Sequence, residues 1–79
     1  MADVYASAKS SVAVVPNDNT DVDFNSLYVG TAGDVTIKHT ADGAAVNYKN
    51  VPAGFNLNVY CRRVMATGTT ASDITGMKW

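Results

Sequence analysis

The sequence of 79 residues contains neither glutamate nor glutamine, and it has only two leucines, one histidine and one cysteine. A single cysteine excludes an internal disulfide, and one cysteine with one histidine cannot build a structural zinc site. Leucine, glutamate and glutamine are among the strongest helix formers after alanine, so their scarcity argues against a helical fold.

Charge and long apolar runs are also scarce. Six Lys and Arg against seven Asp give a formal net charge of −1, and a nucleic-acid-binding protein of this size would need a basic stripe. The longest aliphatic run is Val12-Ala13-Val14-Val15, whereas a membrane-spanning helix needs about 20 apolar residues. The first residues lack the features of a secretory signal. We therefore expect no nucleic-acid and no membrane partner, and synthesis in a reducing cytoplasm.

The residues that are abundant favour β-structure. Eleven valines and eight threonines are β-branched, and the many Asn, Asp and Gly residues supply turns. A chain of this length buries only about 60% of the surface that it exposes when unfolded, so its stability alone is marginal. Since disulfides and zinc are excluded, oligomerisation is the remaining source of stability.

The spacing of apolar and turn residues predicts an all-β fold, a small antiparallel β-sandwich or open barrel of five to six short strands. Residues 1–11 are rich in Ala and Ser and are interpreted as a flexible N-terminal arm, followed by a single β-domain over 12–79. The expected strands cover residues 12–15, 26–29, 34–40, 44–49, 55–65 and 74–79.

Two of these strands carry the most distinct patterns. Strict alternation over 34–40 is followed by Asp42-Gly43, a strong signal for a hairpin to 44–49. Alternation over 55–65 predicts the longest strand, with one apolar and one mixed face. The predicted core consists of Leu27, Val35, Ile37, Phe55, Leu57 and Val59.

No pattern of catalytic residues is present, and we expect no enzyme activity, no cofactor and no metal. His39 ends a strand without a catalytic motif around it, so a hydrogen bond to the backbone is the preferred interpretation. Cys61 is interpreted as a small buried residue rather than a nucleophile. Asp18, Asp21 and Asp23 lie in one loop that offers oxygens for calcium, but the EF-hand glycine and glutamate are missing, which favours a solvated polar loop.

The candidate functional residues are those suited to an interface. Tyr60, Arg62, Arg63 and Trp79 are the residues that we predict to contact other subunits. The two arginines either pair with acidic groups of a neighbour or lie on an ordinary strand surface. Trp79 either folds back onto the sheet or packs into a partner, and the second is favoured for a residue at the end of the sequence.

Three segments resemble small virion proteins of tailed phages. They are LYVGTAGDVT (27–36), VPAG (51–54) and RVMATGTTASDI (63–74). The family that they resemble is the spike base protein of phage heads and gene transfer agents, and the resemblance covers about two thirds of the chain, from Phe24 onward. These motifs are turn and strand signatures.

The resemblance implies a virion structural protein on the capsid exterior, made in the host cytoplasm. It would be a decoration (cement) protein or a head-spike base. The implied partners are the chain itself, as a homotrimer or homopentamer, the major capsid protein and a head fibre protein. Two alternatives remain open: a tail or fibre-attachment module, and a carbohydrate- or ligand-binding domain with an aromatic platform of Tyr28, Tyr48, Tyr60 and Trp79.

Overall fold

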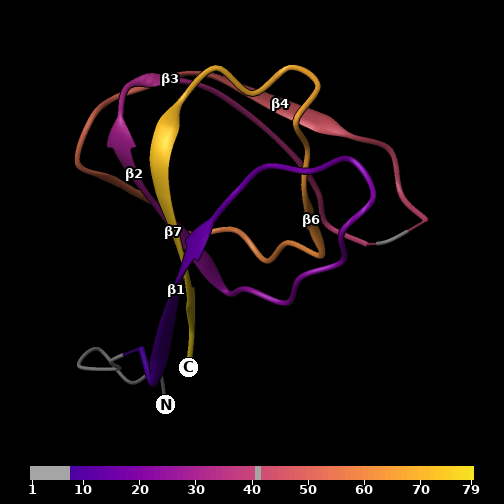
Figure 1. The fold of residues 1–79 in the computed structure, drawn as a ribbon, viewed down its shortest axis with the longest axis horizontal. Helices are drawn as coiled ribbons and strands as arrows, with labels where there is room; N and C mark the ends of the chain where they lie inside the picture. Colours follow the sequence, from indigo (N-terminus) through magenta and orange to yellow (C-terminus); the bar gives the residue numbers. More distant parts are fainter. Residues whose placement is uncertain (1–7, 41) are drawn as a thin grey trace.

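The computed structural model describes residues 8–40 and 42–79, which form seven short strands in two antiparallel sheets (Figure 1). The first seven residues of the expected arm lie outside this range, and Ser10 and Ser11 already belong to the first strand. The strands are β1 (Ser10–Val14), β2 (Ser26–Thr31), β3 (Gly33–Lys38), β4 (Val46–Val51), β5 (Phe55–Leu57), β6 (Arg63–Val64) and β7 (Ser72–Lys78).

The sheets differ in size. One has four strands in the order β1-β7-β2-β5, and the other has three in the order β4-β3-β6. The prediction of an all-β fold, a sandwich or open barrel, is confirmed: both sheets are open and neither closes into a barrel, and the described residues form seven strands where five to six were expected. Among the described residues no helix has the length and apolar character needed to cross a membrane. The core between the sheets is formed by buried apolar residues of both, with others from the connecting segments: Phe24, Leu27, Val29, Val35, Ile37, Val51, Leu57, Cys61, Val64, Ala71 and Ile74.

The chain passes between the sheets at a tight corner. β2 belongs to the four-stranded sheet and β3 to the other, with only Ala32 between them. Ala71, the residue before β7, approaches this corner so closely that a Cβ at Gly33 would lie 2.5 Å from its backbone nitrogen. Glycine is therefore required at position 33 by space alone.

The predicted hairpin around Asp42-Gly43 is confirmed. β3 and β4 pair antiparallel, with Val35 opposite Tyr48 and Ile37 opposite Val46. Val35 and Ile37 are fully buried, as the alternation predicted. β6 pairs with the other side of β3, where Ile37 lies opposite Val64.

The prediction of one long strand over 55–65 is wrong. β5 ends at Leu57, where the Val59 amide donates to the Leu57 carbonyl at 2.9 Å and turns the chain out of the four-stranded sheet. The chain then crosses to the three-stranded sheet and forms β6. The continuous alternation arises because both halves of the segment face the same core from different sheets.

This crossing also changes which residues form the core. Leu27, Val35, Ile37 and Leu57 are buried as predicted, and Val59 packs against the core while partly exposed. Phe55 was predicted to be buried but is 43% exposed, because it lies in an edge strand.

The smaller sheet does not cover the whole of the larger one. In β1, Val12 lies opposite Gly76 of β7, which in turn lies opposite the buried Leu27 of β2, so Val12 faces the inner side of the sandwich. It is nevertheless 53% exposed. The segment 15–24, not a strand, lies over this part of the sheet.

One testable consequence concerns Gly76, in the middle of β7 between β1 and β2. A Cβ there would lie 2.5 Å from the ring of Phe24. We expect Gly76→Ala to lower the free energy of unfolding by about 1–3 kcal/mol, the usual cost of overpacking. Chemical denaturation measures this, with the exposed Ser72→Ala in the same strand as control. In a Phe24→Leu background the loss should shrink, and an equal loss in both backgrounds would contradict the steric explanation.

Candidate interaction surface

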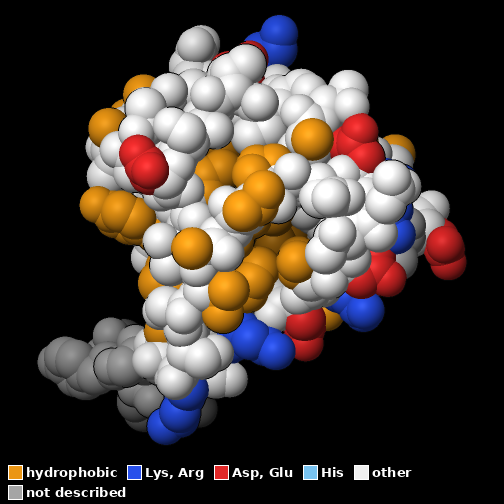
Figure 2. Space-filling model, in the orientation of Figure 1, with side chains coloured by type: hydrophobic (Ala, Val, Ile, Leu, Met, Phe, Trp, Pro, Cys, Tyr) orange, Lys and Arg blue, Asp and Glu red, His pale blue; other side chains and the backbone are white. Residues whose placement is uncertain are grey.

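An apolar groove lies beside β1, under the part of the sheet that has no facing strand. Its volume is about 310 Å³, and Figure 2 shows apolar side chains gathered in a hollow at the centre of this face. Val15 at its margin is 84% exposed. The residues that line the groove all come from β1 and the segment after it: Val12, Ala13, Val14, Val15, Asn17, Thr20, Val22 and Phe24.

The segment that forms the far wall of the groove is held to β6 by the backbone. The Asn17 amide donates to the Val64 carbonyl at 2.9 Å, and the Val22 amide donates to the Arg62 carbonyl at 2.7 Å. Phe24 and Cys61 exchange backbone hydrogen bonds of 3.1 and 2.9 Å. The segment therefore substitutes for a strand beside β6.

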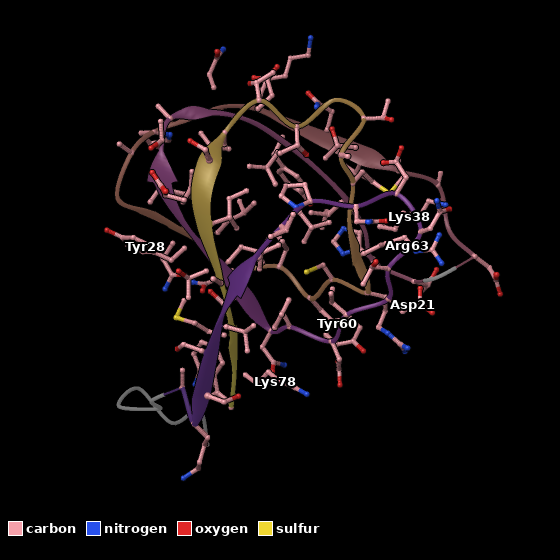
Figure 3. The ribbon with its side chains drawn as sticks, viewed as in Figure 1. Asp21, Tyr28, Lys38, Tyr60, Arg63 and Lys78 are labelled. Carbon is pink, nitrogen blue, oxygen red and sulfur yellow. The ribbon has the colours of Figure 1, made fainter. Side chains whose placement is uncertain are left out.

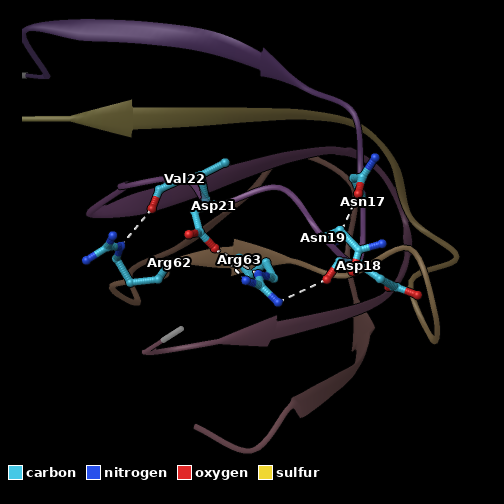
Figure 4. A network of polar contacts seen from close by, with 7 residues as sticks. All are labelled: Asn17, Asp18, Asn19, Asp21, Val22, Arg62 and Arg63. Atoms are coloured by element: carbon cyan, nitrogen blue, oxygen red, sulfur yellow. Dashed lines mark hydrogen bonds and ion pairs between the residues drawn. The ribbon is translucent and has the colours of Figure 1, made fainter. Parts of the chain in front are cut away.

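Arg63 fastens the same segment through its side chain (Figure 4). Its Nε and one terminal nitrogen donate to the Asp21 carboxylate at 3.0 and 2.6 Å, and its other terminal nitrogen donates to the Asp18 carbonyl at 3.1 Å. Arg63 therefore has an acidic partner within its own chain, whereas the sequence suggested either an acidic group of a neighbour or an ordinary strand surface.

The Asp18 carboxylate joins this segment to the loop after β6. It accepts hydrogen bonds from the Ala66 and Thr67 amides at 2.8 and 2.9 Å, and from the Thr67 hydroxyl at 2.6 Å. The hydrogen bonds from Thr67, above all the one from its hydroxyl, lower the pKa of Asp18. Arg63 lowers the pKa of Asp21, first by hydrogen bonding and then by its charge.

The loop is therefore held by its own carboxylates and is not merely solvated. Two of its three carboxylates are engaged by donors of the chain, and Asp23 lies 3.7 Å from the Lys78 ammonium. Among residues 8–40 and 42–79, no group of three His, Cys, Asp or Glu side chains gathers as metal ligands would.

Arg62 and Trp79 lie at the same end of the sandwich, joined by the segment 22–25. The Arg62 Nε donates to the Val22 carbonyl at 3.0 Å, which leaves its terminal nitrogens without a partner in the described part of the chain. The Trp79 amide donates to the Asn25 side chain at 3.3 Å, and the Trp79 residue is 47% exposed.

Tyr60 lies in the crossing between β5 and β6 and is 43% exposed (Figure 3). Its carbonyl accepts a hydrogen bond from His39 Nδ1 at 2.8 Å, which confirms the predicted backbone contact of the histidine. Because a carbonyl can only accept, Nδ1 carries the proton, and in the neutral ring Nε2 accepts from the Tyr48 hydroxyl at 3.3 Å. His39 thus holds the backbone at Tyr60 in place.

Cys61 is fully buried, as interpreted from the sequence. Burial, with a smaller effect from the Asp23 charge, raises the pKa of its thiol to about 11. At neutral pH the side chain is a protonated thiol, which is a poor nucleophile.

The four aromatic residues of the carbohydrate-binding alternative do not all lie together, although Tyr48 and Tyr60 both contact His39. Tyr28 is in the four-stranded sheet opposite Asn56 and Thr75, whereas Tyr48 is in the three-stranded sheet. Figure 3 shows Tyr28 and Tyr60 on different sides of the fold. No single stacking platform joins these residues.

Sequence reasoning missed the groove and the fastening of its far wall. The signal for the second was present, since Asp18 and Asp21 lie in one acidic loop and Arg62-Arg63 is the one basic pair. What the sequence does not reveal is that Arg63 contacts Asp18 and Asp21 of the same chain, although more than 40 residues separate them.

Comparison with known proteins gives one informative match. No family model matches the sequence, and no curated protein does. A solved structure described as the capsid of a native gene transfer agent particle, computed with C5 symmetry, contains a similar chain. The two are 32% identical and superpose with a TM-score of 0.82, over 99% of this chain and 92% of the other. The likeness therefore extends beyond the two thirds that the sequence motifs indicated.

The lowered pKa values of Asp18 and Asp21 predict loss of stability in acid. A carboxylate whose pKa falls on folding stabilises the fold above its ordinary value of 3.8, and this contribution disappears as the pH falls through the folded pKa. We expect Asp18→Asn to lower the denaturation midpoint at pH 7 and to flatten its decline below pH 3.8. Asp42→Asn, at an exposed turn residue, is the control. An unchanged acid profile in Asp18→Asn would contradict this role.

Proposed function

Because the chain belongs to the same family as the matched gene transfer agent capsid chain, we propose that it is a virion structural protein that binds the outer surface of a capsid as a homo-oligomer. In this role it decorates and stabilises the shell or forms the base of a head spike. Its partners are copies of itself and the major capsid protein, and in the spike-base role also a head fibre. It is made in the host cytoplasm before assembly.

The observation that carries the proposal is the match to a chain of a capsid particle at 32% identity over nearly the full length of both chains. Such agreement involves the whole sandwich, not a shared motif. It also supports a head location over the alternative of a tail or fibre-attachment module, since the description of that structure refers to a capsid.

The surface supports assembly. Large apolar side chains are exposed on β1, on both sheets and at the end of β7, and a monomer gains nothing from their exposure. A standard interface covers about 800 Å² per partner, which is about a sixth of the 4755 Å² accessible surface of this chain. Two such contacts, one with each neighbour in a ring, would cover about a third of this surface.

Within this proposal, Tyr60, Arg62 and Trp79 contact neighbouring subunits. His39 fixes the backbone at Tyr60, and Asn25 fixes the backbone at Trp79, so both aromatic residues project from held positions of the chain. The terminal guanidinium nitrogens of Arg62, which have no partner among residues 8–40 and 42–79, can donate to a carboxylate of a neighbour. Arg63 contributes indirectly, because its side chain holds the wall of the groove.

The solution mass and the binding to capsids test the proposal together. Light scattering over a range of concentrations should give a discrete trimer or pentamer, and the purified protein should co-sediment with capsids that lack it. A monomer at all concentrations that also fails to bind capsids would overturn the proposal.

Arg62→Ala separates assembly from folding. The variant loses the 3.0 Å hydrogen bond to the Val22 carbonyl, which costs the fold about 1 kcal/mol. We expect a larger effect on assembly, with at least a tenfold rise in the concentration at half-assembly. Lys49→Ala, at an exposed position of β4, is the control. Equal losses of stability and assembly would contradict the interface role.

A further inference from the structure

The outer edge of β1 is open. β1 pairs with β7 on one side, and no described strand pairs with its other side. Its sequence, Ser-Ser-Val-Ala-Val, has neither the charge nor the proline that usually protects an edge strand from pairing with another chain. This edge can therefore accept an additional strand.

The apolar groove lies beside the same edge. β1 contributes Val12 and Val14 to it, Val15 follows directly after, and Val22 and Phe24 form the opposite wall. A strand that pairs with β1 directs every second side chain to the inner side of the sheet, where the groove lies. The volume of about 310 Å³ is at the lower end of the range for ligand sites, roughly 300–1,000 Å³, and suits a few small side chains.

The sequence before β1 has the pattern of such a strand. Small apolar residues at positions 2, 4, 6 and 8 (Ala, Val, Ala, Ala) alternate with Asp, Tyr, Ser and Lys at 3, 5, 7 and 9. The apolar positions are in phase with Val12 and Val14 of β1. This alternation therefore predicts a strand with one face of small apolar residues and one polar face.

A second copy is the better source of this strand than the same chain. To reach its own groove the segment would have to reverse direction, but residues 4–13 contain no Gly, Pro, Asn or Asp to form a turn. The Lys9 amide is bound to the Lys78 carbonyl, at the opposite end of β1 from Val14 and Val15. Seven extended residues span about 25 Å. This length is comparable with the 35 × 28 × 19 Å dimensions of the chain, so the segment is long enough to reach a neighbouring copy.

We propose that residues 2–8 of one copy add a strand to the free edge of β1 in the neighbouring copy and place Val4 in its groove. The inference rests on the proposed homo-oligomer and names the contact that links its subunits. In the proposed trimer or pentamer each copy donates its segment to one neighbour and receives a segment from the other, so the contact is head-to-tail and generates a ring when the rotation closes.

Mixed disulfide formation tests this exchange. One preparation carries Val4→Cys and another carries Val15→Cys, and the two are mixed, allowed to assemble and oxidised. The native Cys61 is buried, and its raised thiol pKa keeps it out of the exchange. We expect covalent pairs between the two preparations. Val46→Cys, at an exposed valine of β4, replaces Val15→Cys in the control mixture and should give at least tenfold fewer pairs.

Three results would overturn the inference. The first is equal cross-linking with Val46→Cys, which would indicate random collision. The second is a disulfide that forms only within single chains of a Val4→Cys/Val15→Cys double variant, which would place the segment in its own groove. The third is the absence of either product from a sample that still contains the oligomer.

Introducing a charge on the apolar face of the segment 2–8 gives an independent test, with the concentration at half-assembly as the measured quantity. Val4→Asp should raise the concentration at half-assembly at least tenfold without changing the denaturation midpoint of the monomer, whereas Ser7→Asp, on the polar face, should assemble normally. If Val4→Asp assembles normally while the unaltered protein binds capsids, the inference fails and the proposed function stands. If the unaltered protein neither assembles nor binds capsids, the proposed function fails, and the inference with it.

Discussion

The structure depends on a mismatch between its two layers, because a three-stranded sheet cannot cover a four-stranded one. β1 is the strand left over, and Val12 on its inner side is half exposed even though its neighbours across the sheet, Gly76 and Leu27, are buried. The chain compensates with the segment 15–24, which is bonded along β6 where a fourth strand would lie. A segment of this kind covers less apolar surface than a strand, and the groove is what it leaves uncovered.

The polar contacts follow from this compensation. An irregular segment has few ladder hydrogen bonds, so its position is fixed by side chains: Arg63 on Asp21, and Asp18 on the amides of Ala66 and Thr67. These charge-assisted bonds are stronger than neutral ones. The acidic loop and the arginine pair, which in the sequence look like surface features, are thus the means by which a small chain closes its open side.

Local patterns predicted the parts of the fold that local chemistry determines. The hairpin of β3 and β4 follows from alternation and from Asp42-Gly43, and both features act within a few residues. The segment 55–65 could not be predicted in the same way, since alternation is identical whether a strand continues or the chain changes sheets at Asn58. The exposure of Phe55 and the pairing of Arg63 with Asp21 depend on contacts distant in sequence, which periodicity does not encode.

Two of the three segments that resemble phage virion proteins meet at one place in the structure. Segments 27–36 and 63–74 join at the corner between the sheets, where Thr31 donates to Asp73 at 2.8 Å and the Asp34 amide donates to the Thr70 hydroxyl at 2.8 Å. The corner also has Gly33 against Ala71. These two segments therefore specify how the two layers are joined. Among the described strands none pairs with the outer edge of β1, and such an edge is a hazard to a monomer but a connection point in a closed ring.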